Sequence, residues 1–194
     1  VNAMHYAANS YYQLKQYETA LEQYSALADI QGNPYMEEAC MRVAELSYDK
    51  QEYRTAQYYF QRMYSVASNS QMRQTALLGM LRCSHHVQDT IATIDYAGKL
   101  LEMESLDEAI RNEALYCRAS AQYTRGEYGL AVVDYTLLAK NVRTQWGAES
   151  KYRAAECYYH LGAIDMAEQE IMSFTGMQTS HQYWLAKSLI LLAD

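Results

Sequence analysis

The segment YYQLKQYETALEQY, residues 11–24, decides the fold because close copies of it recur along the chain. The copies are SYDKQEYRTAQYYF from Ser47, QYTRGEYGLAVVDY from Gln122 and YYHLGAIDMAEQEI from Tyr158. In each of them a tyrosine precedes an alanine by eight residues: the pairs are Tyr12/Ala20, Tyr48/Ala56, Tyr123/Ala131 and Tyr159/Ala167. Regular self-similarity of this kind is the signature of a repeat protein built from stacked supersecondary units.

A weaker copy is expected between the second and the last two. There the segment ATIDY places Ala92 and Tyr96 in the positions of Ala20 and Tyr24. The alanines then fall at 20, 56, 92, 131 and 167, with steps of 36, 36, 39 and 36 residues. The sequence therefore predicts five units, at about 1–34, 35–70, 71–105, 106–144 and 145–176.

Each unit is predicted to be a pair of helices, because its apolar residues follow the helical period of 3.6. The expected apolar positions of the second helices include Tyr17, Ala20, Leu21, Tyr24, Leu27 and Ala28, then Tyr53, Ala56, Phe60 and Met63, then Tyr128, Ala131, Val132, Tyr135 and Leu138. The first helices carry a small residue where two helices come close, at Ala8, Ala44, Ala119 and Ala155. One proline and eight glycines leave few helix breakers, so the fold class is all-α.

Turn and capping residues fall between the expected helices. Within the units the turns are expected at residues 15–16, 50–52, 125–127 and 161–163. Between units, Asn33 is suited to cap a helix whose first residue is Pro34, and Ser105 with Glu108 has the form of a capping box.

The pattern of small residue, tyrosine, tyrosine, alanine and aromatic, written here as Ala8, Tyr11, Tyr17, Ala20 and Tyr24, resembles the tetratricopeptide repeat. The step of 36 differs from the usual ~34 residues of that family, and the third copy departs further, with Asp89 at the loop and Gly79 or Met80 at the close-packing site. The resemblance implies a right-handed superhelical solenoid of about five hairpins plus a C-terminal helix at 180–194, with the first helices lining a concave groove. The longer step resembles repeats of bacterial cell-envelope proteins, which favours the periplasm, whereas free cysteine thiols favour a reducing compartment, so a cytoplasmic location stays open.

Composition restricts the partners. A net charge of −7 and a pI near 5.2 argue against nucleic acid, whose binding depends on lysine and arginine neutralising phosphates. No apolar run approaches the ~20 residues that cross a bilayer, so direct membrane insertion is not expected. The chain shows no leader in residues 1–10 and opens and closes within helical patterns, so it is expected to be an excerpt of a longer protein.

The implied groove makes the exposed positions of the first helices the candidate partner-binding site. Two segments match closely, since Arg42, Glu45 and Tyr48 have the spacing of Arg153, Glu156 and Tyr159. Aromatic and arginine side chains dominate the binding energy of protein interfaces. The full candidate set is Asn9, Tyr12, Arg42, Glu45, Tyr48, Tyr116, Tyr123, Tyr152, Arg153, Glu156 and Tyr159. Alternatively, each arginine pairs with its glutamate on a solvated face and the tyrosines fill space between repeats.

Motifs of catalysis are not found: the sequence has no phosphate-binding loop, nucleophile elbow or Cys-x-x-Cys pair, and no cofactor is expected. His85, His86 and Asp89 are interpreted as a solvated turn and not as metal ligands. The four cysteines fall in different hairpins and are interpreted as buried thiols. A carboxylate clamp of the chaperone type is not expected, because His5, Arg42 and Glu45 accompany Asn9.

The sequence therefore predicts a scaffold, not an enzyme, that binds a protein or peptide segment in the concave groove. Two alternatives stay open. The chain is a structural or self-assembling spacer of a larger multi-repeat protein, or an accessory region of a larger enzyme or transport system. Apolar residues of the C-terminal helix favour self-association through it; they are Tyr183, Trp184, Leu185, Leu189, Ile190 and Leu192.

Overall fold

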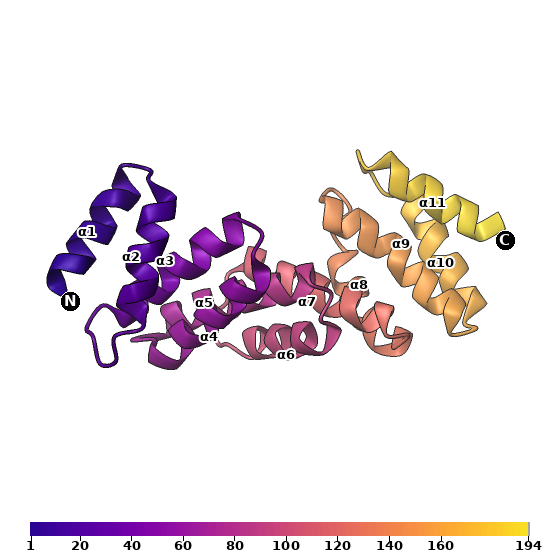
Figure 1. The fold of residues 1–194 in the computed structure, drawn as a ribbon. Coiled ribbons are helices and arrows are strands. Elements are labelled where there is room, and N and C mark those ends of the chain that lie inside the picture. Colours follow the sequence, from indigo (N-terminus) through magenta and orange to yellow (C-terminus); the bar gives the residue numbers. More distant parts are fainter. Residues whose placement is uncertain (194) are drawn as a thin grey trace. The chain divides into compact units, whose positions relative to one another are not determined.

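The computed structural model describes residues 1–193, which form eleven α-helices and no strand (Figure 1). This confirms the predicted all-α class of five helical hairpins followed by a C-terminal helix. We call the first helix of each copy its A helix and the second its B helix. The bounds are α1 (Asn2–Gln13), α2 (Tyr17–Ala28), α3 (Met36–Asp49), α4 (Tyr53–Val66), α5 (Ser70–His86), α6 (Thr90–Leu101), α7 (Glu108–Thr124), α8 (Tyr128–Leu138), α9 (Gln145–His160), α10 (Ile164–Thr175) and α11 (Gln182–Ala193).

The chain divides into two compact units, and each is described by itself. Unit 1 is Val1–Ala92, and unit 2 runs from Thr93 on. Within unit 1, α2 packs against α1 and α3, and α4 packs against α3 and α5. Within unit 2, α8 packs against α7 and α9, and α10 packs against α9 and α11. Each B helix named here therefore lies against its own A helix and the next one, as in stacked hairpins.

One turn geometry closes all five A helices. The second residue after the last helical residue has a left-handed backbone, with φ between 57° and 76°, at Lys15, Gln51, Gln88, Gly126 and Gly162. In the first turn the Lys15 amide donates to the Tyr12 carbonyl and the Gln16 amide donates to the Tyr11 carbonyl. The same two bonds recur in the other four turns. This is the Schellman motif, which pairs carbonyls that a helix end leaves open.

These turns correct the register of the third copy by one residue. The left-handed residue Gln88 lies 37 positions after Gln51, so His85 takes the place of Tyr48 and Thr93 takes the place of Ala56. Burial agrees, because Thr93 and Ala97 are buried whereas Ala92 and Tyr96 are only half-buried. The expected assignment of Ala92 and Tyr96 was therefore wrong. The threonine at position 93 hid the alanine pattern, and a neighbouring alanine supplied a false match.

The core follows the predicted small-and-large pattern. Ala8, Ala44, Ala119 and Ala155 are all fully buried, and so are Ala20 and Tyr24 on the B helix of the first copy. Tyr17, which was expected among the apolar positions, is instead 45% exposed. It lies edge-on to Tyr12, with ring centres 5.6 Å apart. The first tyrosine of this B helix therefore covers the hairpin turn and does not enter the core.

Two capping predictions were also wrong. Helix α3 begins at Met36, and the Asn33 side chain accepts a hydrogen bond from the Tyr35 amide while donating to the Leu27 carbonyl. Asn33 thus joins the end of α2 to the approach to α3. Helix α7 begins at Glu108, where the Asp107 side chain accepts from the Ala109 amide.

Candidate partner-binding site

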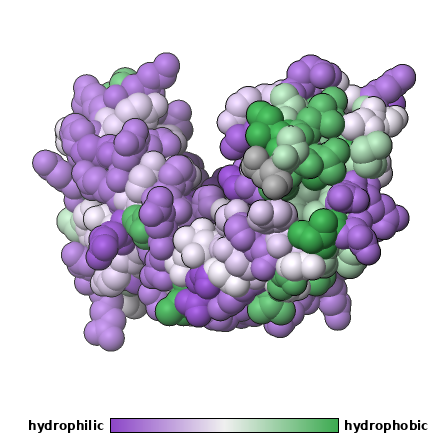
Figure 2. All heavy atoms as spheres, turned by 90° about the vertical axis from the view of Figure 1, so that its right-hand side faces the viewer, coloured by the Kyte–Doolittle hydropathy of each residue, from purple (hydrophilic) through white to green (hydrophobic). Residues whose placement is uncertain are grey.

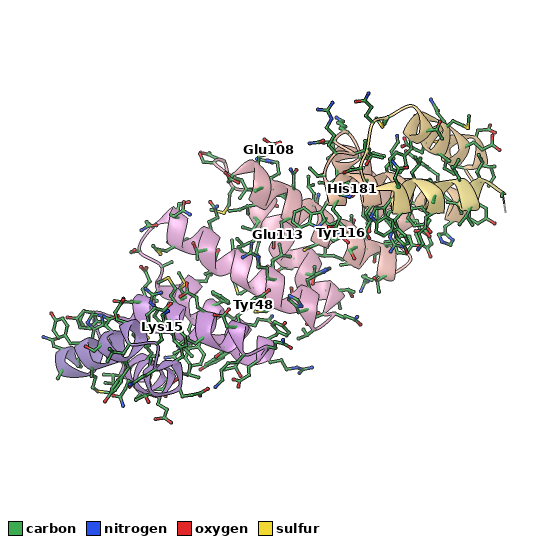
Figure 3. The ribbon with its side chains drawn as sticks, turned by 90° about the horizontal axis from the view of Figure 1, so that it is seen from above. Lys15, Tyr48, Glu108, Glu113, Tyr116 and His181 are labelled. Carbon is green, nitrogen blue, oxygen red and sulfur yellow. The ribbon has the colours of Figure 1, made fainter. Side chains whose placement is uncertain are left out.

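The eleven predicted site residues lie on A helices in both units. In unit 1 they come from α1 and α3, and in unit 2 from α7 and α9. Figure 3 labels one of them on each side of the division, Tyr48 on α3 and Tyr116 on α7. The two sets resemble each other in sequence, but their surroundings differ, as the following contacts show.

The unit 1 residues meet at a pocket of about 340 Å³. Four of the five predicted unit 1 residues line it: Tyr12, Arg42, Glu45 and Tyr48. The remaining lining residues, from the end of α3, from α4 and from α5, were not predicted; they are Asp49, Phe60, Thr75, Leu78, Gly79 and Arg82. Three successive A helices thus contribute to one hollow, which is the arrangement that a groove-binding repeat needs.

Arg42 organises one wall of this pocket. Its guanidinium carbon lies 4.6 Å from the centre of the Tyr12 ring, a cation–π contact. Its Nη1 donates to Glu45 Oε2 at 3.0 Å and to the Tyr12 hydroxyl at 3.4 Å. Partial burial opposes the charge of the guanidinium, but Glu45 and Tyr12 outweigh it and raise the pKa of Arg42 above its ordinary value. Arg42 is therefore a fixed positive charge at neutral pH.

Asn9 does not line the pocket. Its amide nitrogen lies 2.9 Å from His5 Nε2, and its amide oxygen accepts a hydrogen bond from the Tyr24 hydroxyl. His5 in turn contacts Glu38 of α3 at 2.7 Å and stacks on Tyr35. These bonds use the amide of Asn9 to join α1 to α2 and, through His5, to α3, so the structure gives this residue a packing role.

In unit 2, Arg153 is held more tightly than Arg42. Its guanidinium carbon lies 5.2 Å from the Tyr123 ring centre and 5.7 Å from that of Tyr152. Two carboxylates face it, Glu156 at 2.8 Å and Glu149 at 3.6 Å, and their side chains are only 16% and 12% exposed. The Tyr152 hydroxyl also donates to Glu156. The polar groups of this cluster therefore largely satisfy one another.

Two further aromatic contacts fill the unit 2 surface. Tyr116 stacks on Trp146 with ring centres 5.5 Å apart, and Tyr152 stacks on Trp184 at 5.7 Å. Burial, with Glu149 nearby, raises the pKa of Tyr116 above its ordinary value. Tyr159 is 42% exposed and lies edge-on to His160. The packing alternative thus describes Tyr116, Tyr123 and Tyr152 well, whereas Tyr159 stays accessible.

His86, expected from the sequence to be part of a solvated turn, ends α5, and its packing position recurs at His160. His86 stacks on Tyr53, with ring centres 4.4 Å apart and planes 2° apart. His160 stacks on Tyr128 at the same distance, with planes 15° apart. Both histidines end an A helix and cover the first tyrosine of the preceding B helix. The register of the hairpins could have shown this equivalence, but the misplaced third copy concealed it.

Other chemistry is limited in the described residues. Within 1–193, no group of three or more His, Cys, Asp or Glu side chains is placed to hold a metal ion. Among those same residues, no helix combines the length and the apolar composition that crossing a membrane requires. The four cysteines are buried free thiols, and burial raises the pKa of Cys83 and of Cys157 to about 12.

Comparisons with known proteins identify the fold. The crystal structure of MamA superposes with a TM-score of 0.63 at 14% identity, covering 94% of this chain and 92% of that one. A tetratricopeptide repeat protein from Parabacteroides merdae gives a TM-score of 0.59 at 14% identity, covering 91% of this chain and 80% of that one. A putative kinesin light chain of Podosopora anserina also contains TPR-like repeats. Its structure superposes with a TM-score of 0.58 at 13% identity, covering 90% of this chain and 92% of that one. No family model and no curated protein matches the sequence.

Proposed function

We propose, on the premise that this chain has the tetratricopeptide-type fold found in those structures, that it binds a segment of another polypeptide. The observation that carries the proposal is the unit 1 pocket, where Tyr12, Arg42, Glu45 and Tyr48 line one hollow. The proposed action is binding and not catalysis. Aromatic and arginine side chains around a concavity give large contact area and directed polar contacts together, which is what a binding surface requires.

The unit 1 pocket is favoured over the unit 2 cluster as the contact surface. Glu45 keeps 41% of its side chain exposed, against 16% for Glu156. Tyr123, Tyr152 and Arg153 already contact one another, so a partner would have to displace existing contacts to use them. Tyr159, at 42% exposure, is the predicted unit 2 residue best placed to add to a partner contact.

The test is partner capture followed by titration with purified components. The groove variant combines Arg42→Ala with Tyr48→Ala, and the control combines Arg54→Ala with Tyr58→Ala on α4, which removes the same two side-chain types elsewhere. Tyr58 is 56% exposed. A partner that loses at least about tenfold in affinity for the groove variant and not for the control supports the proposal. Equal binding by all three proteins would refute it.

A second function, self-assembly, is favoured by one surface of unit 2. The helix α11 packs Trp184 and Leu185 against Val142, Ala148 and Phe174. Other apolar side chains of this helix are exposed: Tyr183 is 63% exposed and Ile190 64%. Figure 2 shows apolar residues gathered at this end of the unit. A second copy of the chain, applying the same face, is the occupant we propose for it.

Self-assembly is tested by the mass of the chain in solution. Sedimentation should show a dimer whose dissociation constant rises at least about tenfold in Tyr183→Ser with Ile190→Ser. The matched control is Tyr6→Ser on α1 with Leu14→Ser directly after it, which removes apolar side chains of similar exposure, 65% and 67%. A monomer at all concentrations would exclude this second function.

A further inference from the structure

The corrected register explains why unit 1 has a pocket beside Tyr48. Arg42 lies nine residues before its left-handed turn residue Gln51, and Arg153 lies nine before Gly162. The residue nine before Gln88 is Gly79. In the second and fifth copies the arginine covers the tyrosine near the end of the preceding A helix, Tyr12 or Tyr123. At the third copy the glycine supplies no side chain to cover Tyr48.

Gly79 also brings an aromatic ring to the bottom of the pocket. A Cβ atom on this residue would lie only 2.5 Å from the Phe60 ring, so the backbone of α5 and that ring are in direct contact. Phe60 is 6% exposed, and it lines the pocket together with Gly79. Besides Gly79, the lining of this hollow includes three aromatic rings, those of Tyr12, Tyr48 and Phe60.

The net charge of the lining residues and the volume of the pocket indicate which kind of chemical group would fill it. Arg42 and Arg82 carry two formal positive charges, and Glu45 and Asp49 carry two negative ones, so the lining has no net charge. An incoming cation would meet Arg82 at the position that a glutamate, Glu45 or Glu156, holds in the second and fifth copies. A volume of about 340 Å³ is at the lower end for a small-molecule site and is sufficient for one large side chain. A neutral and bulky group fits best.

We propose that this pocket binds one aromatic side chain, phenylalanine, tyrosine or tryptophan, of a partner polypeptide. The proposal rests on the proposed function and names the anchor that the partner supplies. Rings pack edge to face against the aromatic lining, and the guanidinium groups of Arg42 and Arg82 offer cation–π contacts. Leucine would gain the buried area without these directional contacts, and arginine would add an unbalanced charge.

The first arm of the test uses single amino-acid derivatives and the full chain. N-acetyltyrosinamide is titrated into the protein while the amide NMR signals of Thr75, Leu78 and Gly79 are followed, and N-acetylleucinamide and N-acetylargininamide serve as comparisons. We expect the tyrosine derivative to bind tightest at these signals. Equal or tighter binding of the arginine derivative, or no shift at Gly79, would overturn the aromatic assignment.

A filled pocket provides the matched variant. Leu78→Trp places an indole in the hollow, and Thr75→Phe fills it from a second position should the first variant lose helicity. Gln71→Trp adds the same indole at an exposed position of α5. We expect either filled variant to weaken binding of the tyrosine derivative at least about tenfold and Gln71→Trp to leave it unchanged. Unchanged binding in folded Leu78→Trp or Thr75→Phe would overturn the pocket.

The second arm separates the anchor from the proposed function. Random peptides displayed on phage are selected on the full chain, and the aromatic residues of each selected peptide are replaced by alanine. Peptides whose affinity for the chain falls at least about tenfold on one such replacement support both proposals. Peptides that bind without an aromatic residue uphold polypeptide binding and overturn the anchor. Binding of the tyrosine derivative with no selected peptide upholds the pocket and overturns polypeptide binding.

Discussion

The guanidinium carbon of Arg153 lies 5.2 Å from the centre of the Tyr123 ring, thirty residues earlier in the chain. The pair Arg42 and Tyr12 has the same spacing and a similar distance, 4.6 Å. The two contacts differ in their carboxylates, because those facing Arg153 are mostly buried whereas Glu45 is largely accessible to water. Two sites that look alike in sequence therefore differ in what their arginine does for stability.

Replacing Arg153 by alanine should cost more stability than replacing Arg42. Without Arg153, the poorly hydrated carboxylates of Glu149 and Glu156 lose their cation, and we expect a loss of about 2–3 kcal/mol. Arg42→Ala should cost less than about 1 kcal/mol, since water can solvate Glu45. Urea unfolding followed by circular dichroism measures both. Similar losses would show that the burial of the carboxylates has no bearing on the difference.

An ion pair between α7 and α8, whose carboxylate is buried, gives a second stability prediction. The carboxylate of Asp134, a residue only 2% exposed, accepts two hydrogen bonds from Arg118, at 2.7 and 2.9 Å. We expect Arg118→Met to destabilise the chain by about 3 kcal/mol, because it leaves a buried charge unpaired. The double variant Arg118→Met with Asp134→Leu should recover at least half of that loss. A double variant less stable than the single one would argue against this explanation.

The contact between Gly79 and Phe60 predicts a substitution that acts against helix propensity. Alanine normally stabilises a helix interior by about 1 kcal/mol relative to glycine. At position 79 its Cβ would overlap the Phe60 ring, so we expect a net loss of about 1 kcal/mol. Gly98→Ala is the control, since nothing lies within 4 Å of a Cβ there, and it should stabilise.

A double variant isolates the ring as the cause. If the Phe60 ring produces the loss at position 79, Gly79→Ala combined with Phe60→Leu should cost at least about 0.5 kcal/mol less than the two single losses added together. Thermal and urea unfolding of the four proteins complete the cycle. Additive losses would place the cause elsewhere in α5.

Alkaline pH should destabilise the fold through buried thiols. Burial raises the pKa of Cys83 and Cys157 from the ordinary 9 to about 12. In the unfolded chain these thiols lose their protons near pH 9, so above that pH the unfolded state binds fewer protons than the folded one. Their contribution is complete below pH 9 and is lost as the pH rises toward 12, at up to about 1.4 kcal/mol per pH unit for each thiol.

The measurement compares urea unfolding at pH 8, 9 and 10 in the natural sequence and in Cys83→Ala with Cys157→Ala. The double variant should start less stable and should lose less stability between pH 9 and pH 10. Tyrosines with raised pKa values, such as Tyr24 and Tyr135, add to the loss at higher pH in both proteins. Parallel curves would exclude the thiols as the source.

The sequence predicted the hairpins because their packing is local and periodic. The alanines and the tyrosine-to-alanine spacing mark positions where helices touch, so Ala8, Ala20 and Tyr24 were placed correctly. The pocket was predicted only in part. Tyr12 and Arg42 could be recognised from their positions on A helices. Phe60 could not, because it lies on a B helix and lines the pocket beside Gly79 of α5, which has no side chain. Periodicity assigns Phe60 to the core and has no means of showing that it also lines a hollow.

The register of the third copy shows a second limit. The spacing of the alanines favoured Ala92, whereas backbone geometry at Gln88 assigns the position to Thr93. A one-residue error of this kind rotates every assignment on a helix by about 100°, which turns core positions into surface ones. The sequence accordingly predicted Gly79 or Met80 at the close-packing site, whereas Gly79 takes the place of Arg42.

Because the five turns are equal, they also show which segments of a repeat have a constant number of residues and which vary. From the close-packing residue to the left-handed residue is seven positions, as from Ala44 to Gln51, and five more lead to the B-helix core residue. In the third copy this spacing assigns the close-packing site to Leu81, so the expected Gly79 or Met80 was wrong. Differences in repeat length therefore arise between a B-helix core residue and the next close-packing residue, a stretch that includes the joints 29–35, 67–69, 102–107 and 139–144. These joints are where a fluorescent label, a protease site or a whole inserted domain should be accommodated without unfolding the array, and the turns within hairpins are where it should not.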